Sequence, residues 1–357
     1  MKAKILLQDG TLLEGKSFGA EKTVFGEIVF NTGMTGYQEI LTDPSYAGQI
    51  VVMTYPLIGN YGINEEDVES KFIHVNGFVV KEFSEEESNW KSTKKLSEYL
   101  KENDIIGISD IDTRMLTKKI RTKGTMNCVM TTGEITPELE TQLKSYKFPQ
   151  NIVSQVSEKD SKIIKGGNIK IGLIDLGVKT GIIKNLVAQG CDVHLFPWNT
   201  SAETLLSSSL DAVLFSNGPG DPKDVKEVIQ TAKELIGKIN IYGICLGVQI
   251  LALAIGADTY KLKFGHRGSN HPVIDLRTNK VQITAQNHGY AVCPDSLPDN
   301  AKITHLNVND DTVEGFCCPE LKIEAVQFHP EAGPGPKDCE YIFKNWIDQL
   351  RREEQYA

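Results

Sequence analysis

The sequence predicts an α/β protein with two domains: a C-terminal domain with a mainly parallel sheet covered by helices, preceded by a smaller mixed α/β domain. The chain has 357 residues, more than one small hydrophobic core usually serves. The segment 156–168 is charged, contains glycine and lacks a sustained hydrophobic periodicity, which is typical of a linker. After it, apolar strands alternate with helices, as in a parallel sheet covered on both faces. We therefore expect domains at 1–155 and 169–357.

The first domain is predicted to mix short strands and turns with a few helices. In 26–56, β-branched and aromatic residues lie between Gly, Asn and Asp-Pro punctuation, which favours strands joined by loops. The stretch 110–124 has helical spacing, with Ile111, Met115 and Ile120 near one face. Lysines and arginine crowd its end before a glycine, as the helix dipole and a glycine stop favour.

The second domain shows a repeated change from strand to helix. Apolar strands are predicted within 169–177, 191–198, 211–222 and 239–247, and helices within 180–190 and 248–257. Ligands of such sheets bind at loops beyond the carboxyl ends of the strands. The loops at Gly218 and Cys245 hold that position.

Composition limits the class of protein. The net charge of −9 argues against a nucleic-acid surface, and no apolar run approaches the roughly 20 residues that span a bilayer. Asp9 comes too early for the apolar region of a signal peptide, so we expect a cytoplasmic enzyme. The seven cysteines are odd in number and form no CxxC pair, which does not favour disulfides. Six of them fit small buried hydrophobic positions. Cys245 is the exception because of its neighbours.

Cys245 lies in a pattern typical of a nucleophile elbow. In the text YGICLGVQ a strand ends, the cysteine occupies a tight turn between Gly243 and Gly247, and a helix follows. The positive end of a helix dipole favours the thiolate of a sulfur placed there. The motif alone also fits a buried structural cysteine at the start of a helix.

A cysteine nucleophile needs a base, and the base needs an orienting group. His329 and Glu331 are two residues apart at the end of an apolar strand, so both side chains can face the same side. The carboxylate can fix the imidazole tautomer and leave the other nitrogen toward Cys245. An ordinary surface turn would also explain the H-P-E sequence at 329–331. We find no His, Cys, Asp and Glu grouping with metal-ligand spacing and expect no metal site.

Together these motifs resemble those of the class I glutamine amidotransferases. The resemblance implies hydrolysis of the glutamine side-chain amide to glutamate and ammonia through a thioester. It implies that Cys245 attacks the amide carbon, that His329 is general base and then acid, and that Glu331 orients His329. The N–H groups of Leu246 and Gly218 are the implied oxyanion-hole donors.

The same resemblance implies the residues that hold L-glutamine. Gln249, four residues after the cysteine and so on the same helix face, matches the glutamine-binding Gln of the family. Asn287, Gly289 and Tyr290 match the segment that holds the amino-acid end of the substrate. Gly220 belongs to the same glycine loop as the second oxyanion donor, and a simple turn would also account for that loop.

The sequence of the first domain indicates which kind of glutamine amidotransferase the chain resembles. The stretches 26–62, 110–124 and 328–336 resemble signature stretches of the small-subunit family of carbamoyl-phosphate synthetases. The resemblance to this family extends over nearly the whole chain. That family places the serine of TDPSY, Ser45, at the glutamine site. It implies a large partner subunit that binds ATP, Mg²⁺ and bicarbonate and receives ammonia through an internal passage, with no cofactor in this chain. No phosphate-binding G-x-x-x-x-G-K-[ST] loop occurs here, in agreement with that division.

Two alternatives stay open on the residues alone. One is an amidotransferase subunit of another synthase, or a hydrolase that reuses the elbow. The other is a non-catalytic module that keeps the fold. The sequence also leaves open whether the product feeds arginine, pyrimidines or both.

Overall fold

The computed structural model describes residues 1–356. They divide into two compact units, Met1–Pro149 and the part from Gln150 onwards. The segment 156–168, predicted as a linker, lies in the second unit and contains β10 (Lys162–Ile164), which pairs antiparallel with β12 (Cys191–Pro197). The strand could not be recognised in the sequence, because it is only three residues long and just one of its side chains, Ile164, is even half-buried.

The first unit is built on a closed barrel of strands. The barrel strands are β1 (Lys2–Leu7), β2 (Leu12–Ser17), β3 (Thr23–Asn31), β4 (Gln49–Met53), β6 (Gly77–Val79), β8 (Ile106–Ser109) and β9 (Met126–Thr131). Around the barrel they follow the order β1-β2-β8-β6-β4-β3-β9. Neighbours from β3 to β8 are parallel, and the other pairs are antiparallel. A separate parallel pair joins β5 (Leu57–Ile58) and β7 (Glu82–Phe83).

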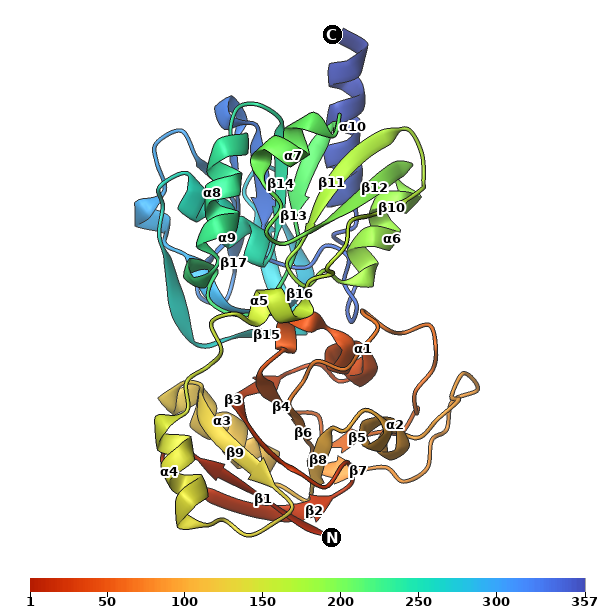
Figure 1. Ribbon diagram of the computed structural model, residues 1–357, viewed down its shortest axis with the longest axis vertical. Helices are drawn as coiled ribbons and strands as arrows, with labels where there is room; N and C mark the ends of the chain where they lie inside the picture. Colours follow the sequence, from red (N-terminus) through yellow and green to blue (C-terminus); the bar gives the residue numbers. More distant parts are fainter. Residues whose placement is uncertain (357) are drawn as a thin grey trace. The chain divides into compact units, whose positions relative to one another are not determined.

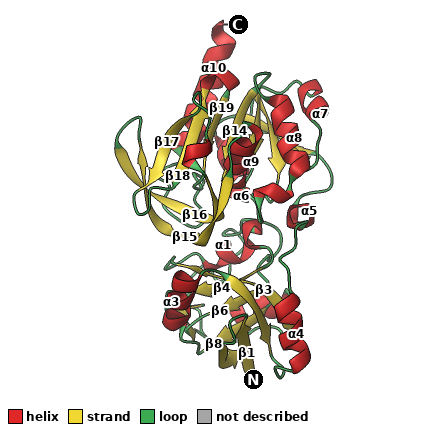
Figure 2. Ribbon diagram, turned by 90° about the vertical axis from the view of Figure 1, so that its left-hand side faces the viewer, coloured by secondary structure: helices red, strands yellow, loops and turns green. Residues whose placement is uncertain are grey.

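The helices of the first unit are α1 (Tyr37–Thr42), α2 (Leu96–Glu102), α3 (Thr113–Lys123) and α4 (Pro137–Ser145). Figure 2 shows α3 and α4 flanking the barrel strands. The helix predicted at 110–124 is present as α3, capped by the side chain of Asp112 and followed by Gly124. Its fully buried residues include Leu116 and Ile120, whereas Met115, which we expected on that face, is only half-buried.

The prediction of strands joined by loops over 26–56 was wrong at α1. Tyr37, Ile40 and Leu41 recur at helical spacing and are all buried. The side chain of Gln38, also buried, bonds the backbone of Asn64 through both its ends. These tertiary contacts fix a helix of a length that would be marginal in isolation.

The second unit holds a ten-stranded sheet. Besides β10 and β12 its strands are β11 (Ile169–Asp175), β13 (Ala212–Phe215), β14 (Asn240–Ile244), β15 (Thr259–Asp275), β16 (Lys280–Val292), β17 (Lys302–Asn307), β18 (Val313–Cys318) and β19 (Ile323–Val326). Its helices are α5 (Ile152–Val156), α6 (Thr180–Ala188), α7 (Ala202–Ser207), α8 (Lys226–Leu235), α9 (Leu246–Ala254) and α10 (Tyr341–Tyr356).

The prediction of a mainly parallel sheet holds for only one half of it. Strands β12, β11, β13, β14 and β19 are parallel neighbours. The strands β15 to β18 extend the sheet with antiparallel pairings (Figure 2). A short turn joins β15 to β16, and such a connection can only produce an antiparallel pair.

Helices cover both faces of the parallel half, and their packing sets the position of the functional loops. Apolar residues of α7, α8 and α9 share one buried cluster with the sheet, and those of α6 and α10 share another. Figure 1 shows α8 and α9 on one side of these strands and α6 on the other. The carboxyl ends of β11, β13, β14 and β19 therefore open at one edge, where Lys179, Gly218, Cys245 and His329 follow.

Candidate active site

Cys245 occupies the turn between β14 and α9, as the elbow pattern predicts. Its backbone has φ +55° and ψ −102°, a conformation that a non-glycine residue adopts only when its surroundings impose it. The Cys245 N–H donates to the Val326 carbonyl at 2.9 Å. Gly247 is required because a Cβ there would lie 2.1 Å from the Phe215 carbonyl oxygen. The fold thus holds the sulfur on a rigid, tightly packed turn.

His329 and Glu331 lie together directly after β19. The His329 N–H donates to the Ala285 carbonyl of β16 at 2.9 Å, which fixes the backbone. His329 Nδ1 lies 2.7 Å from Glu331 Oε1, and both side chains are almost completely buried. Nε2 has no well-formed hydrogen bond among the described residues, but the Cys245 sulfur lies close enough to raise the pKa of the imidazole. This nitrogen is therefore available to exchange a proton with the sulfur.

Lys179 is a component of this site that sequence reasoning missed. Its Nζ lies 3.1 Å from Glu331 Oε1 and also bonds the Ala332 carbonyl, and its side chain is only 2% exposed. A buried lysine needs an anionic partner, and here the partner is the carboxylate that holds His329. Its position in a loop after an apolar strand, like that of Gly218, was the available signal.

The buried charges of this site shift the pKa values of His329 and Glu331. Burial lowers the pKa of His329, but the Glu331 carboxylate more than compensates and raises it to about 10. Burial raises the pKa of Glu331, but Lys179 and His329 together lower it to about 2. An ionised Glu331 therefore faces an imidazole that readily accepts a proton.

The two predicted oxyanion donors lie side by side. Leu246 begins α9, so its N–H has no partner within the helix. A Cβ added to Gly218, in the loop after β13, would come within 2.9 Å of Leu246 Cδ2 and 2.2 Å of the Leu176 carbonyl oxygen. Gly220, two residues on, has φ +92°. This loop therefore approaches the start of α9 closely because Gly218 has no side chain.

The predicted glutamine-binding residues of β16 and α9 also meet here. Cys245 Sγ lies 3.5 Å from the Asn287 carbonyl oxygen. Gln249 Nε2 donates to the Tyr290 carbonyl at 2.8 Å and to Gln327 Oε1 at 2.9 Å. Gly289 lies between the two backbone contacts. Gln249 thus anchors this segment to the helix that carries the cysteine.

Ser45 belongs to the first unit. It lies in a 3₁₀ turn, Pro44–Tyr46, where its N–H donates to Asp43 Oδ1 at 2.9 Å. Its side chain is buried. The expectation that it contacts glutamine stays a prediction.

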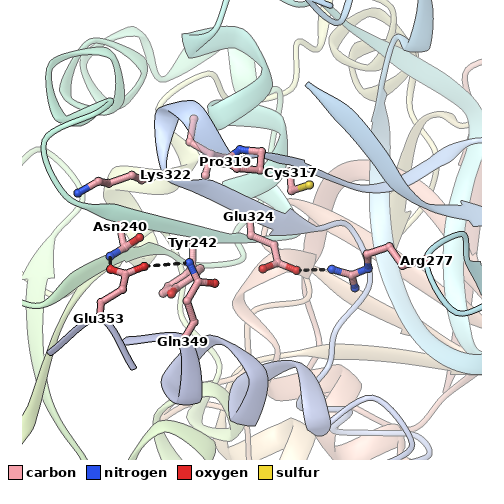
Figure 3. Close-up of a pocket in the computed structure, with 10 residues that line it drawn as sticks. Asn240, Tyr242, Arg277, Cys317, Pro319, Lys322, Glu324, Gln349 and Glu353 are labelled. Carbon is pink, nitrogen blue, oxygen red and sulfur yellow. Dashed lines mark hydrogen bonds and ion pairs between the residues drawn. The ribbon is translucent and has the colours of Figure 1, made fainter. Parts of the chain in front are cut away.

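A second cleft of the second unit, shown in Figure 3, holds no comparable chemistry. It lies beside Asn240 and Tyr242 near the amino end of β14, whereas ligands of parallel sheets bind at the carboxyl ends. Arg277 there pairs with Glu324 at 2.7 Å, and Asn240 donates to Glu353 at 2.8 Å. These polar groups therefore already have partners.

Comparison with known proteins identifies both units. Residues 5–130 match the family model "Carbamoyl-phosphate synthase small chain, CPSase domain", and residues 172–349 match "Glutamine amidotransferase class-I". The described residues contain no helix long and apolar enough to cross a membrane.

Several relatives align over almost their full length. The chain is 52% identical to the carbamoyl phosphate synthase small chain of Clostridium perfringens (97% of this chain, 99% of the relative). It is 51% identical to that of Aquifex aeolicus (97% and 98%) and 48% identical to the pyrimidine-specific small chain of Bacillus subtilis (99% and 98%). The chain therefore belongs to the carbamoyl phosphate synthase small chain family, and its second unit is a class I glutamine amidotransferase domain.

Proposed function

We propose that the chain hydrolyses L-glutamine through a Cys245 thioester and delivers the ammonia to a large subunit that makes carbamoyl phosphate. The observation that carries this proposal is the buried line Lys179–Glu331–His329 beside a cysteine on a strained turn. A purely structural cysteine requires neither an aligned base nor an orienting carboxylate.

The reaction follows from these positions in two steps. Cys245 Sγ attacks the amide carbon, and the oxyanion is stabilised by the N–H groups of Leu246 and Gly218, each worth on the order of 3 kcal/mol. His329 takes the thiol proton of Cys245 during the attack and gives it to the departing nitrogen, so that ammonia leaves and a thioester remains. His329 then takes a proton from water, which attacks the thioester and releases glutamate and the free thiol.

The other predicted residues bind the substrate in this proposal. Gln249, Asn287, Gly289 and Tyr290 form the wall beside the sulfur, and Gly220 shapes the oxyanion loop. Ser45 is proposed to contact the bound glutamine.

The partner supplies the remaining chemistry. Carbamoyl phosphate synthesis requires phosphoryl transfer, and we assign ATP, Mg²⁺ and bicarbonate to the large subunit. The relatives carry names with and without a pathway, so the proposal covers pyrimidine and arginine biosynthesis alike. The cytoplasmic location stays a prediction.

The test combines the chain with its cognate large subunit, ATP, Mg²⁺ and bicarbonate. We expect Cys245→Ser to abolish carbamoyl phosphate formation from glutamine while synthesis from added ammonia continues. Cys293→Ser, at a partly exposed cysteine of the same unit, is the matched control and should keep both activities. Equal glutamine-driven rates in wild type and Cys245→Ser would refute the mechanism. Glutamine hydrolysis that is equally fast with and without the large subunit would refute the coupling.

A further inference from the structure

Three buried potential ligands meet away from the catalytic line, contributed by three neighbouring strands. His266 lies on β15, His288 on β16 and Glu314 on β18, and one ligand atom of each lies within 4.8 Å of the others. Glu314 is fully buried, and both histidines are 5% exposed. The spacing along the sequence gave no sign of this grouping, because it depends on the pairing of β15, β16 and β18.

His288 presents an unused lone pair to this cluster. Its Nδ1 lies 2.7 Å from the Tyr290 carbonyl oxygen. Because a carbonyl only accepts, Nδ1 must carry the hydrogen, and a neutral ring then has its lone pair on Nε2. That Nε2 is buried and has no hydrogen-bond partner among the described residues. An unpaired buried acceptor is costly and calls for an explanation.

His266 has the partner that a metal-binding histidine usually has. Its Nε2 lies 2.9 Å from Asp310 Oδ2, so a carboxylate holds the far side of the ring. Its Nδ1 lies 3.5 Å from Glu314 Oε1. Two ligand atoms bound to one tetrahedral zinc ion at about 2.0–2.2 Å are separated by roughly 3.4 Å.

Glu314 is also held in place from behind. Oε1 accepts from Asn307 Nδ2 and Oε2 from Gln286 Nε2, each at 2.9 Å. A fully buried carboxylate requires a positive partner. A proton shared with His266 would supply one, but it would leave the lone pair of His288 unexplained.

We propose that His266 Nδ1, His288 Nε2 and Glu314 form a binding site for a divalent transition-metal ion such as Zn²⁺. Two imidazoles and one carboxylate favour zinc or cobalt over magnesium or calcium, which prefer oxygen ligands. The ion would replace the proton between His266 and Glu314. His271, whose ring lies 5.2 Å from that of His266 and whose Nδ1 is buried without a partner among the described residues, is the nearest candidate for a fourth ligand.

The site would have a structural role beside the glutamine pocket. His288 lies between Asn287 and Gly289, so an ion there would tie the pocket segment of β16 to β15 and β18. Bound metal should therefore raise the melting temperature of the chain.

The test measures binding and does not depend on glutamine hydrolysis. The full chain carrying Cys245→Ser, which removes the sulfur nearest to His329, is freed of metal with a chelator and titrated with Co²⁺ and Zn²⁺. We expect one ion per chain, with cobalt absorption that shows nitrogen and oxygen ligands and no thiolate charge-transfer band. Glu314→Gln and His266→Gln should each weaken binding at least about 100-fold. His194→Gln, a histidine on β12, should leave it unchanged.

Asp310→Asn covers the possibility that the buried substitutions prevent folding. Its side chain is 42% exposed, so this variant should fold, and it should bind metal about 10- to 100-fold more weakly. No binding by the Cys245→Ser chain would overturn the proposal and leave an ion pair of His266 with the two carboxylates. Equal binding by the Asp310→Asn and parent chains, or by the Glu314→Gln and parent chains, would overturn it as well.

Discussion

Replacing Lys179 by methionine tests whether the buried ion pair stabilises the second unit. The residues are similar in volume, so the change removes mainly the charge. At 3.1 Å and an effective dielectric constant of about 20, the Lys179–Glu331 attraction is about 5 kcal/mol. Removing the lysine also removes its own cost of burial, and Glu331 keeps His329 at 2.7 Å. We therefore expect the unfolding free energy to fall by about 3 kcal/mol, at the lower end for breaking a buried pair.

Thermal unfolding measures this loss. For a unit of about 200 residues, a change of about 3 kcal/mol corresponds to a fall in Tm of roughly 6–12 °C. Lys184→Met, at an exposed lysine of α6, is the matched control and should change Tm by no more than about 2 °C. If Lys179→Met and Lys184→Met melt together, the ion pair does not stabilise the fold, and the reasoning about the buried charges fails.

Three further predictions concern Gly247, His305 and Gln249. Gly247→Ala should cost at least about 3 kcal/mol of unfolding free energy, because the new Cβ would lie 2.1 Å from the Phe215 carbonyl oxygen; Gly133→Ala, with nothing closer than 3.5 Å, should be nearly neutral in denaturant titrations. Burial lowers the pKa of His305 to about 4, so the folded protein keeps this ring neutral at a pH where the unfolded chain protonates it. The contribution of His305 to the unfolding free energy is therefore complete above about pH 6.5 and is lost as the pH falls toward 4. Wild type should lose more unfolding free energy than His305→Gln over that range, and parallel pH–stability curves would contradict this. Gln249→Ala should raise the KM for glutamine about tenfold with a smaller change in kcat, since two hydrogen bonds that hold the pocket segment are lost; an unchanged KM would show that they do not matter.

Local patterns were sufficient to predict the turn at Cys245, the pairing of His329 with Glu331 and several elements. The strand, turn and helix around Cys245 could be predicted because the glycines and the apolar strand mark a tight turn within a few residues. The close approach of His329 and Glu331 could be predicted because both lie on one short segment. The helix at 113–123 has its cap and its stop in its own sequence.

The errors came from elements whose stability is not local. The helix at 37–42 was taken for strands and loops, because its stability comes from buried contacts with distant residues. The strand at 162–164 was taken for linker, because backbone pairing with β12 leaves no apolar pattern. The antiparallel extension of the sheet was missed, because alternation of strands and helices describes only its parallel half.

The sequence by itself determined that Cys245 lies on a tight turn before a helix and that His329 lies beside Glu331, since both arrangements depend on residue types at short spacing. Only the tertiary structure decided which distant groups surround them. Lys179 meets Glu331 across 152 residues, and His266, His288 and Glu314 meet through the pairing of three strands. Such encounters are fixed by sheet order and register, which minimise the free energy of the whole unit and leave no trace in the spacing of any one segment.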